Sequence, residues 1–167
     1  MKDATPGQQD RFNDAYNEFL KRLKANGGDN PCAKLFGGLA NALKTLAKTN
    51  FTAASVQGGN AQTKGRTITI DPTKPFMDAS GYVWIVTGYD IARTDGGIQL
   101  VPQKITVGNV EAAAFILAHE FAHRSDVKGF EPTDANVRTL GGTQAGFAGA
   151  RNNEMIRKAC FGEHTPQ

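Results

Sequence analysis

Two histidines and a glutamate form the pattern in this 167-residue chain whose types and spacing could do chemistry. They are His119, Glu120 and His123, in the segment Leu117-Ala-His-Glu-Phe-Ala-His123. On a helix, residues four apart lie on the same face, so the two imidazoles can bind one metal ion together. The H-E-x-x-H spacing favours Zn²⁺, and Glu120 can then hydrogen-bond a water on the metal and act as general base.

The residues around this motif favour the helix that it requires. Asn109 is a suitable N-cap, and Glu111 places a negative charge in the first turn. The run that follows contains neither Gly nor Pro and includes three consecutive alanines, which favour helix. It is apolar nearly all round, so we expect a central, buried helix. Such a helix has no structural need for two histidines and a glutamate. The motif therefore indicates a metal site of the metallopeptidase type, and the two alternatives are a metal site without hydrolysis and a chance match.

The motif resembles the active-site helix of the zincin metallopeptidases. Together with the terminal segment from Asn152 to Phe161, it resembles a narrower group of bacterial metallopeptidase domains found at the ends of larger surface or repeat-containing proteins. These domains carry H-E-L-G-H, a downstream Asp, and an Asn-led helix that closes on Cys-Phe. This chain departs from that pattern in two places. Phe121-Ala122 replaces Leu-Gly, and Asp126 stands where many zincins have a helix-ending Gly.

The periodicity along the chain predicts a single α+β domain over residues 1–167, with residues 1–9 flexible. Helices are expected at Asp10–Ala25, from Asn30-Pro31 to Lys48, around the motif, and at Asn152–Phe161. Strands are expected at Phe51–Val56, Arg66–Ile70, Tyr82–Thr87, Tyr89–Arg93, Ile98–Val101 and Lys104–Val107. We interpret them as a small, mostly antiparallel sheet, followed after the motif by a Gly-rich loop to about Ala150. The resemblance implies a zincin-like arrangement, in which an edge strand, either Ile68–Ile70 or Val83–Val86, runs beside a peptide-binding cleft.

The expected mechanism is hydrolysis of peptide bonds by a zinc-activated water, with Glu120 as the catalytic base. Zinc in a catalytic site needs a third protein ligand besides His119 and His123. Asp134, eleven residues after His123, matches the downstream Asp of the resemblance and is our preferred ligand. Glu154 is the second choice, and the other candidates are Asp126, Glu131 and His164. An oxyanion-stabilising group is also expected, and Tyr82, Tyr89 and Arg151 are the possible side chains.

Composition narrows the functional class. Apolar residues make up 40% and charged residues 21%, as in an ordinary globular protein. The net charge of +3 is scattered, without the basic stripe of a nucleic-acid-binding protein. No apolar run is long enough for a membrane span. The first residues lack a signal-peptide core, so we expect a domain that is part of a larger chain. We also expect the domain to be monomeric. Its expected partner is a peptide or protein substrate.

The two cysteines, Cys32 and Cys160, lack the spacing of a zinc site. They would be two buried thiols in a cytosolic protein and a disulfide in an exported one. The resemblance favours the disulfide, and with it a secreted or cell-surface bacterial protein. Two other functions stay open. The chain could be a zinc-stabilised binding domain without catalysis, or an effector or toxin module of a larger protein.

Overall fold

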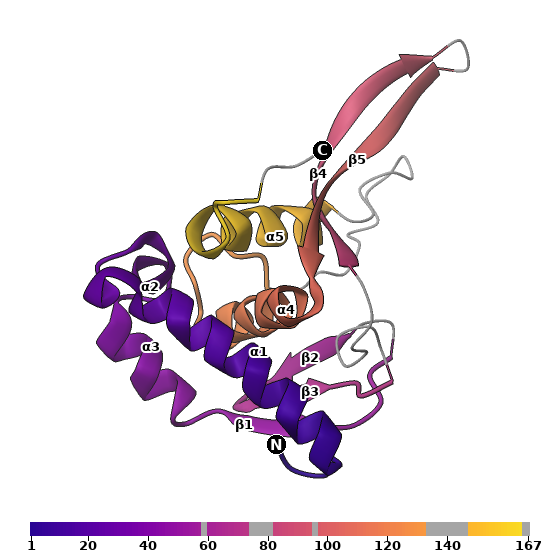
Figure 1. The fold of residues 1–167 in the computed structure, drawn as a ribbon. Helices are drawn as coiled ribbons and strands as arrows, with labels where there is room; N and C mark the ends of the chain where they lie inside the picture. The colour runs from indigo at the N-terminus through magenta and orange to yellow at the C-terminus, as the bar shows by residue number, and fades with distance from the viewer. Residues whose placement is uncertain (58–59, 74–81, 95–96, 133–146, 165–167) are drawn as a thin grey trace.

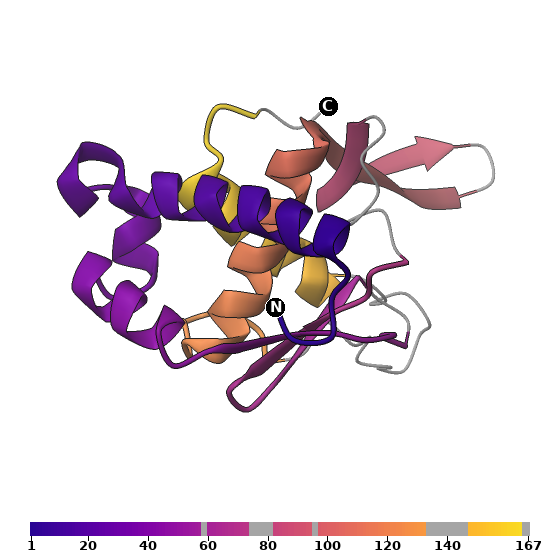
Figure 2. The same cartoon turned by 60° about the horizontal axis from the view of Figure 1, so that its bottom comes forward.

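The computed structural model has an α+β architecture, in which helices surround the motif helix and two small sheets flank it (Figure 1). It describes residues 1–57, 60–73, 82–94, 97–132 and 147–164, and only the backbone of residues 82–84, 91–94, 97–100 and 147–148. The motif helix α4 (Asn109–Arg124) lies between α1 (Pro6–Lys24) and α5 (Phe147–Cys160). Figure 2 shows α1 crossing over α4. The α+β class is therefore confirmed.

The first helix begins earlier than predicted, at Pro6 instead of Asp10. Thr5 and Gln8 form a reciprocal capping box, in which each side chain accepts from the backbone N–H of the other residue. The segment before it is also tied down, because the N–H of Lys2 donates to Phe51 O at 2.9 Å. Residues 1–9, which were expected to be flexible, thus include the first turn of α1 and a strand-like contact with Phe51.

The second predicted helix is divided in two. It consists of α2 (Pro31–Leu35) and α3 (Leu39–Leu46), joined through Gly37 and Gly38. Both glycines have positive φ, at 76° and 94°, a region that glycine adopts readily and that a continuous α-helix excludes. A short 3-10 turn, Ala25–Gly28, links α1 to α2. Gly37-Gly38 therefore ends one helix and begins another; it does not merely weaken a single helix.

A three-stranded sheet lies beside α4, in the order β1-β3-β2. Its strands are β1 (Asn50–Ala53), β2 (Ala61–Lys64) and β3 (Thr67–Ile70). β3 is the central strand, parallel to β1 and antiparallel to β2, and buries Ile68 and Ile70 completely. One of the two pairs in this sheet is antiparallel, and the hairpin of the remaining strands adds another antiparallel pair. The pairing is therefore mostly antiparallel, as predicted, although it is divided between two sheets. Ile68–Ile70 is not an edge strand, because β3 is paired on both sides; β2 is the edge strand next to α4.

The other predicted strands merge into one long antiparallel hairpin. It consists of β4 (Tyr82–Thr94) and β5 (Gly97–Gly108), and its far end projects away from the helices (Figure 1). Lys104–Val107 is therefore the end of β5 and not a separate piece. A register shift between Val86 and Gly88 marks a β-bulge, and the base of β4 packs against α5.

The motif helix is as buried as its composition predicted. Ten of its residues are buried, with Phe115, Leu117 and Phe121 in the central core. It begins one residue earlier than expected for an Asn109 cap: Gly108 is the N-cap and provides no side-chain bond. None of the helices in the described part of the chain combines the length and apolar character that crossing a membrane needs.

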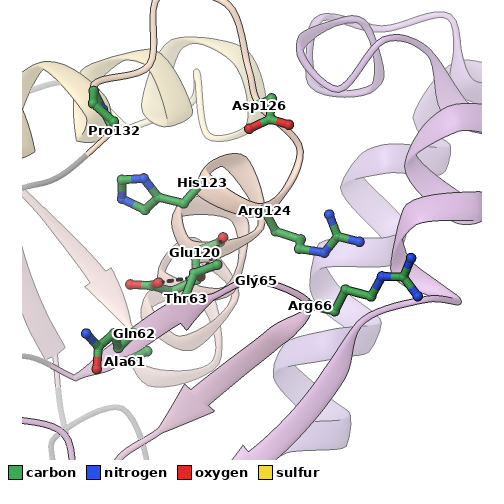
Figure 3. A pocket seen from close by; sticks show the side chains of 10 residues that line it. All are labelled: Ala61, Gln62, Thr63, Gly65, Arg66, Glu120, His123, Arg124, Asp126 and Pro132. Atoms are coloured by element: carbon green, nitrogen blue, oxygen red, sulfur yellow. Dashed lines mark hydrogen bonds between the residues drawn. The ribbon is translucent and has the colours of Figure 1, made fainter.

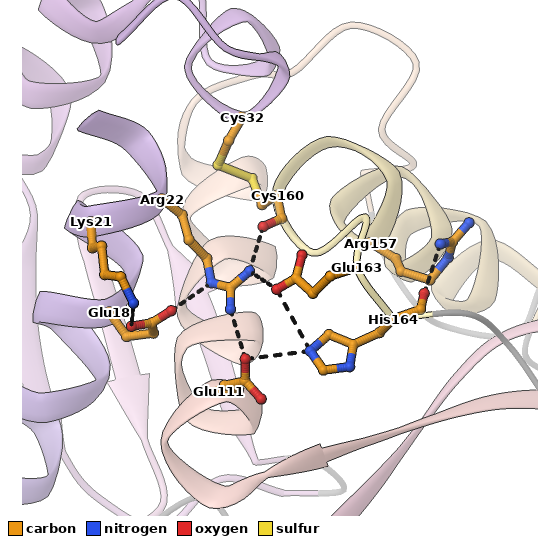
Figure 4. Close-up of polar contacts among 9 residues, drawn as sticks. All are labelled: Glu18, Lys21, Arg22, Cys32, Glu111, Arg157, Cys160, Glu163 and His164. Carbon is orange, nitrogen blue, oxygen red and sulfur yellow. Dashed lines mark hydrogen bonds and ion pairs between the residues drawn. A yellow bond between two sulfur atoms is a disulfide. The ribbon is translucent and has the colours of Figure 1, made fainter. Parts of the chain in front are cut away.

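The closing helix α5 starts before the predicted Asn152 and is joined to α2 by a disulfide. Cys32 and Cys160 form this disulfide across 128 residues of sequence. Arg22 of α1 holds the same end of α5 without a covalent bond, as Figure 4 shows. Its guanidinium donates to Cys160 O at 2.7 Å and lies 3.9 Å from the centre of the Phe161 ring. The position of α5 against the other helices is thus fixed at its C-terminal end.

Candidate metal and catalytic site

The two histidines of the motif lie on neighbouring turns of α4, as their spacing predicted. Their ring centres are 5.0 Å apart in an edge-on arrangement. Phe130, in the segment after α4, packs against both rings, with centre distances of 5.2 Å to His119 and 4.8 Å to His123. His119 is 8% exposed, whereas His123 is more open to solvent. Both imidazoles are therefore held on the same face of the helix by apolar packing.

Glu120 is fixed by a residue from the edge strand. Its side chain is 7% exposed, and Thr63 of β2 donates its hydroxyl hydrogen to Glu120 Oε2 at 2.7 Å (Figure 3). The backbone oxygen of Glu120 lies 2.9 Å from the same hydroxyl. A hydroxyl has a single hydrogen to donate. The contact with the carboxylate is the shorter of the two, and a charged acceptor forms the stronger hydrogen bond. Thr63 thus restrains the carboxylate by its Oε2 atom.

A cavity of about 680 Å³ opens between β2 and the C-terminal half of α4. Glu120 and His123 line it, and so do Asp126, where α4 has just ended, and Pro132 further on. The rest of the lining is Ala61, Gln62, Thr63, Gly65, Arg66 and Arg124. Figure 3 shows the Glu120 carboxylate beside β2 and the side chains of the two arginines extending away from His123. The glutamate and one histidine of the motif therefore face a space that a substrate could enter.

Two adjacent asparagines of α5 hold the other side of the site. Asn153 Oδ1 lies 2.8 Å from His119 Nδ1, and Asn153 Nδ2 donates to the carbonyl of Val86 on β4 at 2.8 Å. Asn152 is completely buried and bonds the backbone of Glu131 twice. It accepts from the Glu131 N–H at 2.8 Å and donates to the Glu131 carbonyl at 3.1 Å. One asparagine therefore orients a motif histidine, and the other anchors the segment that follows α4.

The structure places four of the five candidates for the third ligand. Asp126 lines the cavity in a left-handed conformation with φ of 49°, which agrees with its expected place at the helix end. Glu131 is 3.2 Å from Arg151. Glu154 is paired with Arg157 and Lys158, and the hydrogen bond from Arg157 is the main cause of the lowered pKa of its carboxyl. His164 lies near Glu111, at the far end of α4 from His123. Asp134, our preferred ligand, lies outside the described residues.

The candidates for oxyanion stabilisation remain predictions. Arg151 is engaged with Glu131, Tyr89 lies beyond the bulge in β4, and the side chain of Tyr82 is outside the described part of the chain. Sequence reasoning did not single out Thr63, Asn153 or Phe130. Asn153 stands in the Asn-led segment of the resemblance, but nothing in the sequence assigns Thr63 to Glu120, because 57 residues separate them.

Within the described residues, one set of three acidic or histidine side chains is close enough to share an ion: Glu111, Glu163 and His164 (Figure 4). Arg22 already forms ion pairs with both glutamates, 2.8 Å from Glu111 Oε1 and in direct contact with Glu163. A guanidinium therefore supplies the positive charge in this cluster, and the cluster lies apart from the motif. Comparisons of the chain with protein-family models, curated proteins and solved structures found no match.

Proposed function

We infer that this chain is a zinc-dependent metallopeptidase domain of the zincin type. The observation that carries the proposal is the placement of the motif on α4. His119, Glu120 and His123 occupy adjacent turns of a buried helix, and Glu120 and His123 face a cavity bordered by an edge strand. A buried helix that served only packing would fill these positions with apolar residues.

The residues present suit zinc. Imidazole nitrogens are preferred zinc ligands, and metal-bound histidines normally bond their second ring nitrogen to another group, as His119 does with Asn153. His119 and His123 would hold the ion. Asp134 is the proposed third ligand. Pro132, two residues before Asp134, lines the cavity, and Asn152 anchors Glu131, the residue before Pro132. Zinc supplies a Lewis acid that polarises a carbonyl and makes water a better nucleophile.

The protein's own contribution to the reaction centres on Glu120. Thr63 engages its Oε2 atom, so we assign Oε1 as the oxygen that takes the proton of the attacking water. The same carboxyl can then return the proton to the departing amine. Thr63 limits rotation of the carboxylate, so less freedom is lost on reaching the reactive geometry. Phe130 shields one side of the histidine pair from water.

The proposed substrate is an extended peptide. β2 lies at the edge of the three-stranded sheet and supplies three of the residues that line the cavity, Ala61, Gln62 and Thr63, and Gly65 follows directly after the strand. An extended chain can add to such an edge through main-chain hydrogen bonds, which brings its carbonyl groups past Glu120. The strand expected in this role was Ile68–Ile70 or Val83–Val86, and β2 takes their place in the proposal. We also propose that the protein is exported, since disulfides such as Cys32–Cys160 persist in oxidising compartments.

The test compares the zinc-loaded parent with Glu120→Gln on a broad peptide library. Glutamine has nearly the same shape but cannot accept the proton of the water. We expect the parent to cleave peptides, and the variant to bind zinc equally well yet lose at least about 100-fold in rate, which is the lower range for general-base catalysis. Equal rates would remove Glu120 from the mechanism. A zinc-binding parent that cleaves nothing would favour the zinc-stabilised binding domain.

A further inference from the structure

The side chain of Asn153 joins three elements that meet behind the motif. It projects from α5, contacts the ring of His119 on α4, and donates to the carbonyl of Val86 on β4. That carbonyl lies at the β-bulge, where the ladder between β4 and β5 is interrupted and backbone groups can bond outside the sheet. Asn153 is half-buried, so both of its hydrogen bonds are partly shielded from water.

The bond to Val86 determines which way the amide of Asn153 faces. A backbone carbonyl can only accept, so the group that points to it must be the Nδ2 amine. The oxygen Oδ1 is then the atom that points to His119, 2.8 Å from Nδ1. An amide oxygen can only accept, so the hydrogen of this second bond must reside on Nδ1. The Val86 carbonyl thus determines, through Asn153, where the neutral imidazole carries its proton.

We propose that Asn153 is a positioning residue that holds His119 in the Nδ1–H tautomer, so that Nε2 is the nitrogen presented to the metal. This inference rests on the proposed function. It adds a positioning residue to the metal site and specifies which nitrogen of His119 faces the ion. Without Asn153 the ring could carry its hydrogen on either nitrogen and rotate about its side-chain bonds. Zinc binding would then have to select one tautomer and one orientation, which lowers the apparent affinity.

The test uses two substitutions at Asn153 and one control. Asn153→Leu keeps the size of the side chain and removes both hydrogen bonds. Asn153→Asp keeps an acceptor for His119 Nδ1 and loses only the donor to Val86. The control is Asn41→Leu, because Asn41 also donates its amide to a backbone carbonyl, Phe36 O at 2.8 Å, on a different helix. Circular dichroism and thermal melting establish that each protein is folded.

Two measurements are made on these proteins. The first is the ¹⁵N spectrum of the His119 ring in metal-free protein, at a pH where the imidazole is neutral, assigned with His119→Gln. The parent, Asn153→Asp and Asn41→Leu should show the Nδ1–H form, and Asn153→Leu a mixture of the two tautomers. The second is zinc affinity by competition with a chromophoric chelator. Asn153→Leu should lose about 10- to 100-fold, the usual cost of removing an outer-sphere partner, and Asn153→Asp should recover most of it.

The outcomes separate this proposal from the function it rests on. A parent with His119 in the Nε2–H form overturns the proposal, and so does an Asn153→Leu variant whose tautomer and zinc affinity equal those of the parent. If the parent binds no zinc, the metallopeptidase assignment fails. The tautomer measurement on metal-free protein still reports whether Asn153 determines the tautomer of the His119 ring.

Discussion

Removal of the Cys32–Cys160 disulfide should destabilise the protein substantially while leaving its folded structure intact. The bond closes a loop of 128 residues between the start of α2 and the end of α5. In the chain-entropy treatment, a loop of this length lowers the entropy of the unfolded chain enough to stabilise the fold by about 5 kcal/mol. For Cys32→Ala/Cys160→Ala we therefore expect the free energy of unfolding to fall by about that amount.

The folded state should survive because other contacts hold the same helix end. The bond from Arg22 to Cys160 O involves the backbone, so it remains when the sulfur is removed. The guanidinium also stays over the Phe161 ring, and α5 still packs against β4 and α4. The loss should consequently appear mainly through the greater freedom of the unfolded chain, as the entropy argument requires.

The assay is urea unfolding of the oxidised parent, the reduced parent and the double alanine variant. Reduced parent and variant should agree with each other, and both should lie about 5 kcal/mol below the oxidised parent. The control is Cys32→Ala alone, which should match the double variant because either substitution opens the loop. A loss under about 2 kcal/mol would refute the loop argument. Two free thiols in the intact mass of oxidised protein would refute the disulfide itself.

Two further predictions concern the site. Asp134→Ala should weaken zinc binding by more than the ~100-fold that loss of an outer-sphere partner costs. Glu154→Ala should change zinc binding only a few-fold, because Glu154 is paired with Arg157. Chelator competition measures both affinities, and a larger loss in Glu154→Ala would move the third ligand to α5. Thr63→Val should leave zinc affinity unchanged and lower kcat about tenfold, as expected when a hydrogen bond to a charged catalytic group is lost. An unchanged kcat would show that Thr63 does not hold Glu120.

Composition was sufficient to predict α4, because the run after Glu111 combines strong helix formers with an apolar surface all round. The i, i+4 spacing likewise predicted that His119 and His123 share a face. The early start of α1 was also readable, since Thr5 and Gln8 form a T-x-x-Q capping box with Pro6 at the first helical position. These features depend on residues near one another in sequence, so local rules apply to them.

The strand β2 could not be read in the same way. Ala61-Gln-Thr-Lys64 contains one β-branched residue and no aromatic one, so its extended form depends on pairing with β3 and on contact with α4. Its role at Glu120 went unpredicted for the same reason. Asn153 reaches His119 and Val86 only because α5 packs against the bulge of β4, which is a tertiary arrangement that no local pattern contains.

The central claim is that His119 and His123 hold zinc beside Glu120, and native mass spectrometry of zinc-loaded protein tests it most directly. After exhaustive dialysis, the parent should retain one zinc ion per chain, and His119→Ala and His123→Ala should retain none. The control His164→Ala should keep the ion, because His164 lies near Glu111 at the far end of α4. A parent without zinc, or motif variants that retain it fully, would contradict the account.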